Sequence, residues 1–496
     1  MGVFINKRTF KLFITLQPLS LERMAKAIKM FLFCFLLCHG ADAFSQDSLI
    51  IADDQLYIND ILISGNKVTH ESVILRELIF SAGDTIYKMQ LLPALQRSKE
   101  NLLNLSLFNF VILNIKHLGN SFIDVTVEIT ERWYIWPVPI LEYADRNFNE
   151  FIKNWDWEKI NYGAWLKWNN FRGRNELLTA KVRLGYVKEY ALAYSKPNLG
   201  KRQAHGISAG FNVNQQDEVF IETVNNSPEE YQPQEIPAQV RFNAFTQYTY
   251  RRKYYTWHSL RFEYFDYQIS DSVAIVNSNY LGDGGTRQSF FMLTYQFNYD
   301  VRDSKVYPLE GFNVRFKAEQ LGLGIIPDFD YSTLRLTGIL MFHQKIVNRL
   351  YFYNATKARY SSEKVMPYFL NKALGYNENL RGYEPYVIDG SDYVLSLYNF
   401  KIEVIKPNSF TIPFLGMEQF NKVSYAIYAN IFADAGYVNN NFPNPTNTMV
   451  NTWQFSAGVG IDLVTYYDRV FSIDYVINRY GEHGFFFHVE TPFYRW

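Results

Sequence analysis

The stretch Trp453-Gln454-Phe455-Ser456-Ala457-Gly458-Val459-Gly460-Ile461-Asp462-Leu463 alternates between apolar residues at odd positions and small or polar residues at even positions. Successive side chains of a β-strand point to opposite faces of the sheet, so this period of two places one set on each face. The alternation recurs in other runs of about ten residues, for example over 291–300 and 312–319. These runs predict strands with one apolar face and one wet face.

Runs of this kind continue from residue 134 to the end of the chain, and counting them gives about sixteen strands, the first near 134–144 and the last near 483–495. Aromatic residues make up 18% of the chain and gather near the strand ends, as in the aromatic girdles of membrane barrels. A soluble β-sandwich would also alternate, but its polar face would point outward to water and its apolar face would be buried in its core. Because lipid offers no partner for a bare backbone, the sheet must close on itself. We therefore predict a mainly β fold, with an antiparallel transmembrane β-barrel over 132–496.

An even number of strands puts both ends of the barrel on one side of the membrane. Short turns such as 171–173 and 466–468 then fall on that side. Long loops are predicted on the other side at 214–238, 269–287, 361–392 and 435–451. The connection 406–421 is longer than a turn should be on the side where the two ends of the barrel lie, and the sequence offers no reason for its length.

Residues 24–43 have the pattern of an export signal, in which two lysines precede a short apolar core and the small-residue site Ala41-Asp42-Ala43. The core is too short to span a membrane as a helix. We predict a signal peptide over 1–43, with translation starting at the first residue or at Met24; the alternative is an N-terminal helix that is kept. Both cysteines lie in this signal, so the exported chain has no disulfide to stabilise it.

A small domain is predicted over 56–131, after a linker over 44–55. Its pattern is strand, helix, helix, strand, strand: Gly65-Asn66 ends the first strand, a second helix places leucines at helical spacing over about 88–105, and Gly119-Asn120 turns the final hairpin. Three strands with two helices on one face form a complete small core. The pattern therefore indicates a separate α+β unit before the barrel.

This order, with Ile63 and Gly65-Asn66 closing the first strand and Leu107-Phe108 entering the second, resembles a POTRA domain, the periplasmic module of the BamA/TamA outer-membrane assembly superfamily. The resemblance implies that the domain holds unfolded client segments by adding a strand to an exposed sheet edge. Periplasmic accessory proteins are further partners that it implies. The alternative is a plain α+β spacer.

A long polar connection after the eleventh strand contains Leu380-Arg381-Gly382-Tyr383. Taken alone, these residues fit any surface loop. In the next strand Glu403 shares the lumen-facing parity, and in the strand after that Asp434 does so. Since a guanidinium can engage two carboxylates at once, we predict that the loop folds inward and that Glu403 and Asp434 receive Arg381.

The motif Leu380-Arg381-Gly382-Tyr383 is similar to the loop-six motif of the BamA/TamA superfamily, and Phe432-Ala433-Asp434-Ala435-Gly436 to the inner-wall motif that receives the loop arginine. Asp300-Val301-Arg302-Asp303 resembles the Asp-x-Arg-Asp turn of the family. Gly458-Val459-Gly460-Ile461 followed by Ser472-Ile473-Asp474-Tyr475 resembles its penultimate hairpin. Each motif is weak, but their order along the chain is specific. The chain departs from the family pattern in carrying one POTRA-like domain where assembly factors often carry several.

Pro137 and Pro139 lie two residues apart in the first predicted strand, and Pro492 lies in the last. Proline has no backbone N–H and is tolerated where strand pairing is absent or weak. We therefore predict that the first and last strands pair poorly and form a seam that can open sideways. The alternative is that Pro137 and Pro139 lie just outside the ladder.

The resemblance implies a protein of the outer membrane of a Gram-negative bacterium, with its N-terminal domain in the periplasm, that inserts or secretes client proteins. The alternative is a passive channel or surface antigen, with steady conductance and a lumen not occluded by the loop. No enzyme is predicted: the eight histidines are scattered, His488 and Glu490 are interpreted as solvated wall, and no catalytic, cofactor or metal spacing occurs. A net charge of zero argues against a nucleic-acid partner. The predicted partners are the lipid bilayer and unfolded clients.

Overall fold

The computed structural model of the chain describes residues 55–119, 121–143, 159–282, 284–326, 331–413, 416, 418–465 and 467–489. The predicted signal peptide, the predicted linker up to Asp54, and Pro492 lie outside these residues. Gln55–Trp496 form one compact unit. No helix within the described residues is long and apolar enough to cross a membrane.

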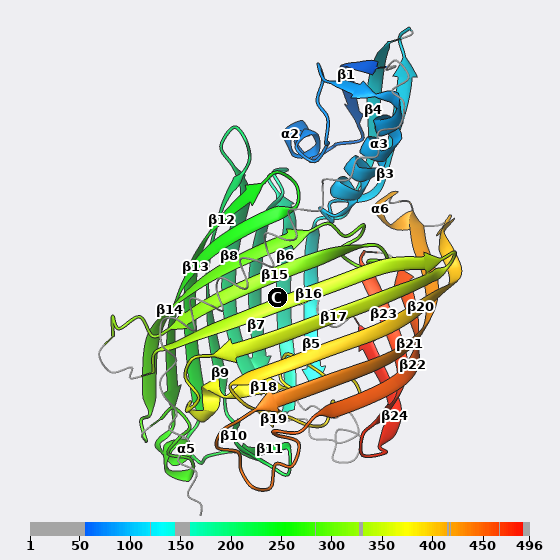
Figure 1. The fold of residues 1–496 in the computed structure, drawn as a ribbon. Coiled ribbons are helices and arrows are strands. Elements are labelled where there is room, and N and C mark those ends of the chain that lie inside the picture. The colour runs from blue at the N-terminus through cyan, green and yellow to red at the C-terminus, as the bar shows by residue number, and fades with distance from the viewer. Residues whose placement is uncertain are drawn as a thin grey trace, which may run out of the picture. The chain divides into compact units, whose positions relative to one another are not determined.

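The described chain begins with a small α+β domain (Figure 1). Its elements are β1 (Gln55–Ser64), α2 (Glu71–Leu75), β2 (Thr85–Tyr87), α3 (Lys88–Leu103), β3 (Phe108–His117) and β4 (Phe122–Glu131). The strands form a sheet in the order β2-β1-β4-β3, in which β1 runs parallel to β4. Leucines 91, 95 and 102 of α3 share one core with Ile58 and Phe108, which are wholly buried. The predicted order of strands and helices is confirmed, with the short β2 as an addition.

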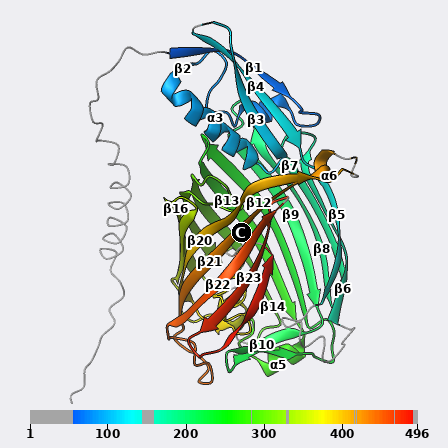
Figure 2. The same cartoon turned by 90° about the vertical axis from the view of Figure 1, so that its right-hand side faces the viewer.

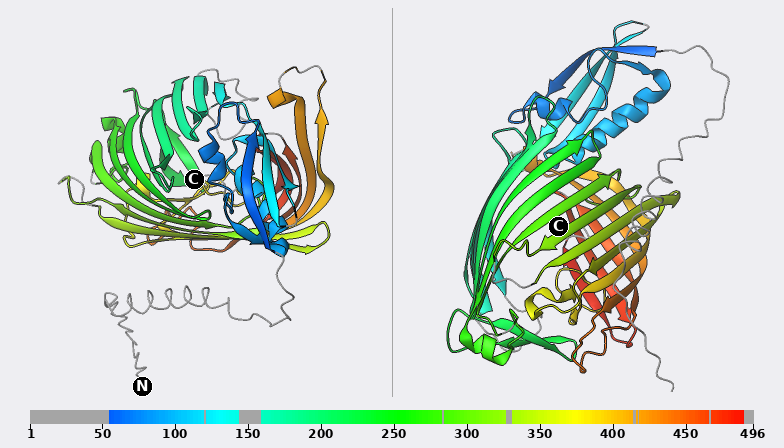
Figure 3. Two further views of the ribbon diagram at one scale, coloured as in Figure 1. Left: turned by 90° about the horizontal axis from the view of Figure 1, so that it is seen from above. Right: turned by 60° about the vertical axis from the view of Figure 1, so that its left-hand side comes forward.

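The rest of the chain forms one antiparallel sheet of sixteen strands, which curls into a barrel (Figures 1 and 3). The strands are β5 (Ile135–Tyr143), β6 (Ile160–Phe171), β7 (Glu176–Gly185), β8 (Val187–Leu199), β9 (His205–Gln216), β12 (Gln239–Arg252), β13 (Thr256–Ile269), β14 (Arg287–Asp300), β15 (Gly311–Leu321), β16 (Thr333–Val347), β17 (Leu350–Ser361), β20 (Asp392–Thr411), β21 (Lys422–Asn439), β22 (Gln454–Thr465), β23 (Arg469–Asn478) and β24 (His483–Val489). Each of the sixteen predicted runs is one of these strands.

Strand β22 shows how the alternation builds the wall. Phe455, Val459 and Ile461 are exposed on the outer face, whereas Ser456 and Asp462 are buried on the inner face. The same division holds along the other strands of this part of the barrel, because each partner in the ladder places its side chain on the same face. The outer surface is therefore apolar, as the period of two predicts, while the inner face carries the polar residues together with buried apolar ones such as Leu395 and Val438.

The predicted connection 406–421 is strand over its first six residues. β20 runs on to Thr411, which lies opposite Lys422 at the start of β21, and the short helix α6 (Glu418–Asn421) closes this hairpin. The ladder shifts register twice between Glu403 and Asn408. Because a β-bulge interrupts the period of two, alternation in the sequence could not show that the strand continues.

The two ends of the barrel differ. The end beside the small domain, called the near end, carries the short turns; the opposite, far end carries longer loops (Figure 2). These loops contain β10 (Val219–Val224), β11 (Ser227–Tyr231), α5 (Asp271–Val276), η2 (Tyr368–Leu370), β18 (Lys372–Leu374) and β19 (Ile388–Asp389). Asn226 joins three of them, since its backbone N–H donates to Asn447 Oδ1 at 2.8 Å and its carbonyl accepts from the N–H of Val387 at 2.9 Å.

The small domain is attached to near-end turns by ion pairs. Arg251, next to the turn after β12, donates to both carboxylate oxygens of Glu77 at 2.6 and 2.7 Å. Burial alone would raise the pKa of Glu77, but the charge and hydrogen bonds of Arg251 lower this pKa below its usual value. Elsewhere Arg132 donates to both oxygens of Asp468, in the β22–β23 turn, at 2.7 and 2.9 Å. These two ion pairs therefore hold the domain to separate turns of the near end.

Candidate functional site

The loop between β17 and β20 folds against the inner wall of the barrel. Its residues Leu374, Leu380 and Tyr383 are buried in one cluster with Leu395 of β20 and Val438 of β21. Apolar burial on this scale stabilises a docked loop, because each fully buried Leu or Val side chain contributes about 1.5–3 kcal/mol relative to exposure. The loop is thus part of the packed interior.

Arg381 and Asp434 form the central polar contact of this loop. Arg381 donates from Nε to Asp434 Oδ2 and from Nη2 to Asp434 Oδ1, both at 2.6 Å. The guanidinium also lies 3.5 Å from the centre of the Phe432 ring. The Arg381 side chain is 9% exposed and that of Asp434 is 0% exposed. The structure therefore brings the predicted loop arginine and one of its two predicted acids together in a buried bidentate pair.

Two glycines make room for this contact. Gly382 has a φ of +81°, a Cβ there would lie 2.9 Å from Val476 Cγ1, and its carbonyl accepts from Asn478 Nδ2 at 3.0 Å. Gly458 of β22 faces Phe432, and a Cβ there would lie 2.5 Å from the ring. Only glycine combines the left-handed backbone at the first position with the close approach at both.

Tyr383 connects the loop to the last hairpin of the sheet. Its hydroxyl donates to the carbonyl oxygen of Phe455 at 3.0 Å and accepts from the backbone N–H of Arg479 at 3.4 Å. Arg479 follows β23 in the turn to β24. The three predicted motif residues therefore contact β21, β22, β23 and the turn that leads into the last strand.

Glu403 does not reach Arg381, which corrects the prediction that two acids receive this arginine. The predicted face is correct, since Glu403 is buried on the inner wall. In the ladder between β20 and β21, however, Glu403 lies opposite Tyr428, whereas Asp434 lies opposite Leu397. The offset of 403 − 397 = 6 residues corresponds to about 20 Å along the strand. Parity fixes the face of a strand residue but not its height in the barrel.

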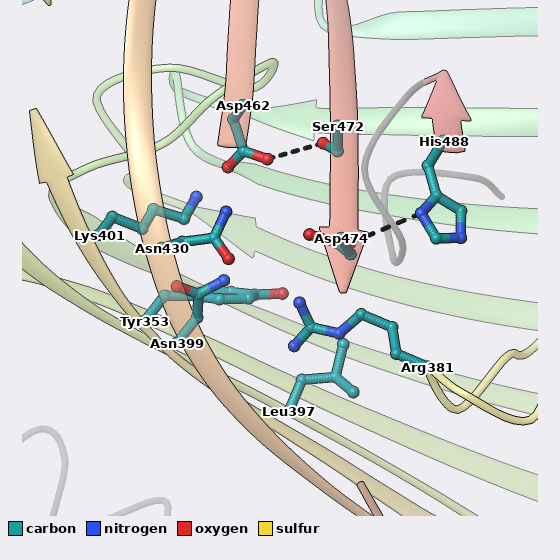
Figure 4. A pocket seen from close by; sticks show the side chains of 10 residues that line it. All are labelled: Tyr353, Arg381, Leu397, Asn399, Lys401, Asn430, Asp462, Ser472, Asp474 and His488. Atoms are coloured by element: carbon teal, nitrogen blue, oxygen red, sulfur yellow. Dashed lines mark hydrogen bonds and ion pairs between the residues drawn. The ribbon is translucent and has the colours of Figure 1, made fainter. Parts of the chain in front are cut away.

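A different acid, Asp474 of β23, lines a cavity of about 40 Å³ beside Arg381 (Figure 4). His488 of β24 also lines this cavity; its imidazole lies 3.6 Å from Asp474 and 3.7 Å from the loop residue Glu384. The inner parity of His488 could be predicted from the sequence. That the loop would bring Glu384 to it could not, because no sequence pattern fixes the path of an irregular segment.

The turn after β14 is built on a second buried ion pair. Arg302 donates from Nε and Nη2 to the two carboxylate oxygens of Asp300, at 2.8 and 2.7 Å. Asp303 Oδ1 accepts from the backbone N–H groups of Ser304 at 2.8 Å and Leu309 at 3.1 Å. The Asp-x-Arg-Asp turn therefore satisfies its own polar groups and gives the near end a fixed corner.

The first strand of the sheet, β5, has its prolines on one backbone side. The carbonyl oxygen of Tyr134 accepts from the N–H of Asn169, next to β6, at 2.8 Å, and the register is regular over Ile135–Tyr143. Backbone groups of successive residues point to alternate sides of an antiparallel strand, so the even positions of β5 face β6. Pro137 and Pro139 therefore lack N–H groups on the side away from β6.

That side of β5 and the outer side of β24 are the two edges of the sheet. Within the described ranges between 55 and 489, β5 pairs with β6 and β24 pairs with β23, and no pairing joins β5 to β24. Pro492 lies beyond the described part of β24, so its place in the seam stays a prediction. At the near end, the Tyr467 ring lies 4.9 Å from that of Trp136 in β5 and 5.7 Å from that of Phe420 in α6.

Comparison with known families gives two matches. Residues 170–467 match the Omp85 superfamily domain, and residues 56–132 match the POTRA family described as a surface antigen variable number repeat. The first match spans more than half of the 496 residues. A search of curated proteins finds no match.

Several solved structures are similar. BamA from Haemophilus ducreyi, solved without POTRA domains 1–3, is 14% identical over 88% of this chain and 84% of its own, with a TM-score of 0.49. CdiB from Escherichia coli is 11% identical over 88% of this chain and 76% of its own, with a TM-score of 0.50. CdiB from Acinetobacter baumannii is 12% identical over 88% and 73%, with a TM-score of 0.45. At these identities the likeness to CdiB from Escherichia coli shows a shared fold.

Proposed function

The chain belongs to the Omp85 superfamily, and on this premise we propose that it is an outer-membrane assembly factor, which inserts client proteins into that membrane or secretes them across it. The barrel spans the outer membrane of a Gram-negative bacterium and the small domain lies in the periplasm. The activity makes and breaks no covalent bond. It lowers the barrier to the folding, insertion or passage of another chain.

The observation that carries this proposal is the pair of sheet edges at β5 and β24. A strand edge presents backbone donors and acceptors to any incoming strand, and a client chain can add to it through main-chain hydrogen bonds. Pro137 and Pro139 remove donors from the β5 edge, which weakens its pairing with β24. An edge that pairs weakly with its neighbour in the barrel is one that a client strand can reach.

The packed interior supports assembly over a passive channel. The loop after β17 occupies the inner wall through the Arg381–Asp434 pair and the apolar cluster around Leu380. The contacts of Asn226 with Asn447 and Val387 join the far-end loops above it. A loop fixed in the lumen obstructs steady conduction, which a passive channel requires.

The small domain offers an edge of its own. Its sheet ends at β3, and Ile112 on that strand is 51% exposed. An unfolded client segment, or a strand of a periplasmic accessory protein, can extend this sheet with little demand on sequence. Capture of a client segment at β3 and its release at the β5 edge then both use main-chain hydrogen bonds between strands.

The test is depletion of the protein from its own host, followed by mass spectrometry of outer-membrane and surface proteins. We expect a defined set of clients to disappear, to return with the wild-type chain, and to return poorly with Arg381→Ala at equal expression. Arg349→Ala, at an exposed near-end turn, is the matched control and should restore the clients. An unchanged set of outer-membrane proteins, together with steady high conductance of the wild type in planar bilayers, would identify a passive channel instead.

A further inference from the structure

Four cations lie on two neighbouring near-end turns. Lys201 and Arg202 are in the turn between β8 and β9, and Arg252 and Lys253 are at the turn between β12 and β13. Strands β9 and β12 pair with each other, and the N–H of Arg251 donates to the carbonyl oxygen of Ala204 at 2.7 Å, so the two turns are adjacent. All four cations are exposed, and none has an acidic partner among the described residues.

The direction of the Arg252 side chain follows from the alternation along β12. Arg251 points inward, where it binds Glu77. Its neighbour Arg252 therefore shares the outer, lipid-facing side with Tyr248 and Tyr250, which are 47% and 36% exposed. Two consecutive arginines thus serve opposite sides of the wall, one with a protein partner and one without.

A row of aromatic rings lies on this outer face, on the far-end side of the cations. His205 of β9, Tyr250 of β12, His258 of β13 and Phe297 of β14 are direct neighbours in the ladder, with ring centres 5.5, 6.2 and 5.4 Å apart along the row. Three of these rings, those of His205, Tyr250 and His258, carry a polar atom, and rings with one apolar and one polar end mark the level of the lipid headgroups in membrane proteins. Tyr250 and Arg252 are two residues apart, so the cations begin about 7 Å beyond this level, toward the near end.

We propose that this surface, made of Lys201, Arg202, Arg252 and Lys253 on the near-end side of the ring row, binds anionic phospholipid headgroups of the periplasmic leaflet. Cations beside a membrane surface attract anionic lipids, and ammonium and guanidinium groups donate hydrogen bonds to phosphate. The outward direction of Arg252 and the lipid-facing rings favour a lipid over an acidic protein segment. The site holds one wall of the barrel in the leaflet, several strands away from the edges at β5 and β24.

This inference rests on the proposed membrane location, and its test separates the two. The full chain is purified in mild detergent, and bound lipid is measured by native mass spectrometry during titration with phosphatidylglycerol or phosphatidylcholine. The variants are K201Q/R202Q and R252Q/K253Q. The control K345Q/R349Q removes the same charge at the exposed near end of β16 and β17, where Lys345 has inner parity.

We expect each of the two variants to bind phosphatidylglycerol about 10- to 30-fold more weakly than the wild type, with the control unchanged. High salt should reduce the difference, since the site is exposed. Heat-modifiable migration on gels verifies that each variant is folded. Unchanged phosphatidylglycerol affinity in both variants, or an equal loss in the control, would overturn the proposal. Polyglutamate, titrated in the same way, stands for an acidic protein segment. Loss of its binding in the variants with lipid binding intact would also overturn the proposal. Absence of the wild type from outer-membrane fractions would instead contradict the proposed location.

Discussion

Replacement of Arg381 by alanine should undock the inner loop. The substitution leaves the Asp434 carboxylate, which is 0% exposed, without its bidentate partner. Removing one partner of a buried ion pair costs about 3–5 kcal/mol, because the remaining charge is uncompensated. The lost contact with the Phe432 ring adds to this, whereas water in the adjoining cavity reduces it. We therefore expect a loss of about 3 kcal/mol in the free energy of unfolding.

A double-mutant cycle separates the pair from other effects of truncation. Asp434→Ala leaves the guanidinium over Phe432 and should cost less, about 2 kcal/mol. The double variant leaves neither charge of this pair, so the singles should be coupled by about 2 kcal/mol. Arg381→Lys keeps the charge but loses the fork and should lie between Arg381→Ala and the wild type. The assay is guanidinium unfolding of the protein in lipid vesicles, followed by tryptophan fluorescence.

A second readout reports on the loop itself. Proteases added outside intact cells should cleave within 362–391 in Arg381→Ala and not in the wild type, because only an undocked loop exposes its backbone. Arg349→Ala, which removes an exposed arginine at a near-end turn, is the control and should leave the loop uncleaved. Additive effects of Arg381→Ala and Asp434→Ala within about 0.5 kcal/mol, with no gain in cleavage, would refute the claim that this pair fixes the loop.

Three further predictions follow from other contacts. Gly458→Ala should destabilise the docked loop by about 1–3 kcal/mol, because a Cβ there meets the aromatic ring under the loop arginine. The control Gly338→Ala, with open space around its Cβ, should change the free energy of unfolding by less than about 0.5 kcal/mol. Unfolding of both variants in vesicles compares them. Asp468→Ala removes the partly exposed bidentate pair with Arg132, which should cost about 1 kcal/mol and raise hydrogen exchange in the link between domain and barrel about fivefold, as mass spectrometry can measure. Because the pKa of Glu77 is lowered in the folded state, its stabilising effect is present above about pH 4.3, the pKa of an exposed glutamate, and is lost as the pH falls through the folded pKa. Acid should therefore release the small domain from the barrel, and Glu77→Gln should remove this dependence on pH.

The strands of the barrel could be predicted from the sequence because each carries its own signal. A period of two needs no knowledge of neighbours, so all sixteen runs were found without the ladder. The role of Glu403 needed the register between β20 and β21, which depends on where two distant strands meet. The strand within 406–421 was missed because its bulges break the alternation.

The candidate site divides in the same way. Arg381, Gly382 and Asp434 could be named because they form a motif, and the structure brings them together. Gly458 and Phe432 lie opposite each other on two neighbouring strands, and the Phe432 ring approaches the backbone of Gly458 closely. This close approach explains why residue 458 has no side chain. Sequence patterns therefore identified Gly458 and Phe432 as members of motifs, but they did not show that one leaves space for the other.

The fixed interior and the sheet edges depend on each other in the proposed activity. A barrel whose first and last strands pair weakly lacks the closure that ordinarily stabilises a membrane sheet. The docked loop supplies an alternative connection, since Tyr383 binds Phe455 of β22 and the turn after β23 while Arg381 binds β21. These contacts hold the last strands to one another from inside, so the β24 edge can part from β5 without unravelling the strands behind it. Undocking the loop should therefore disturb client assembly through the order of the last hairpin.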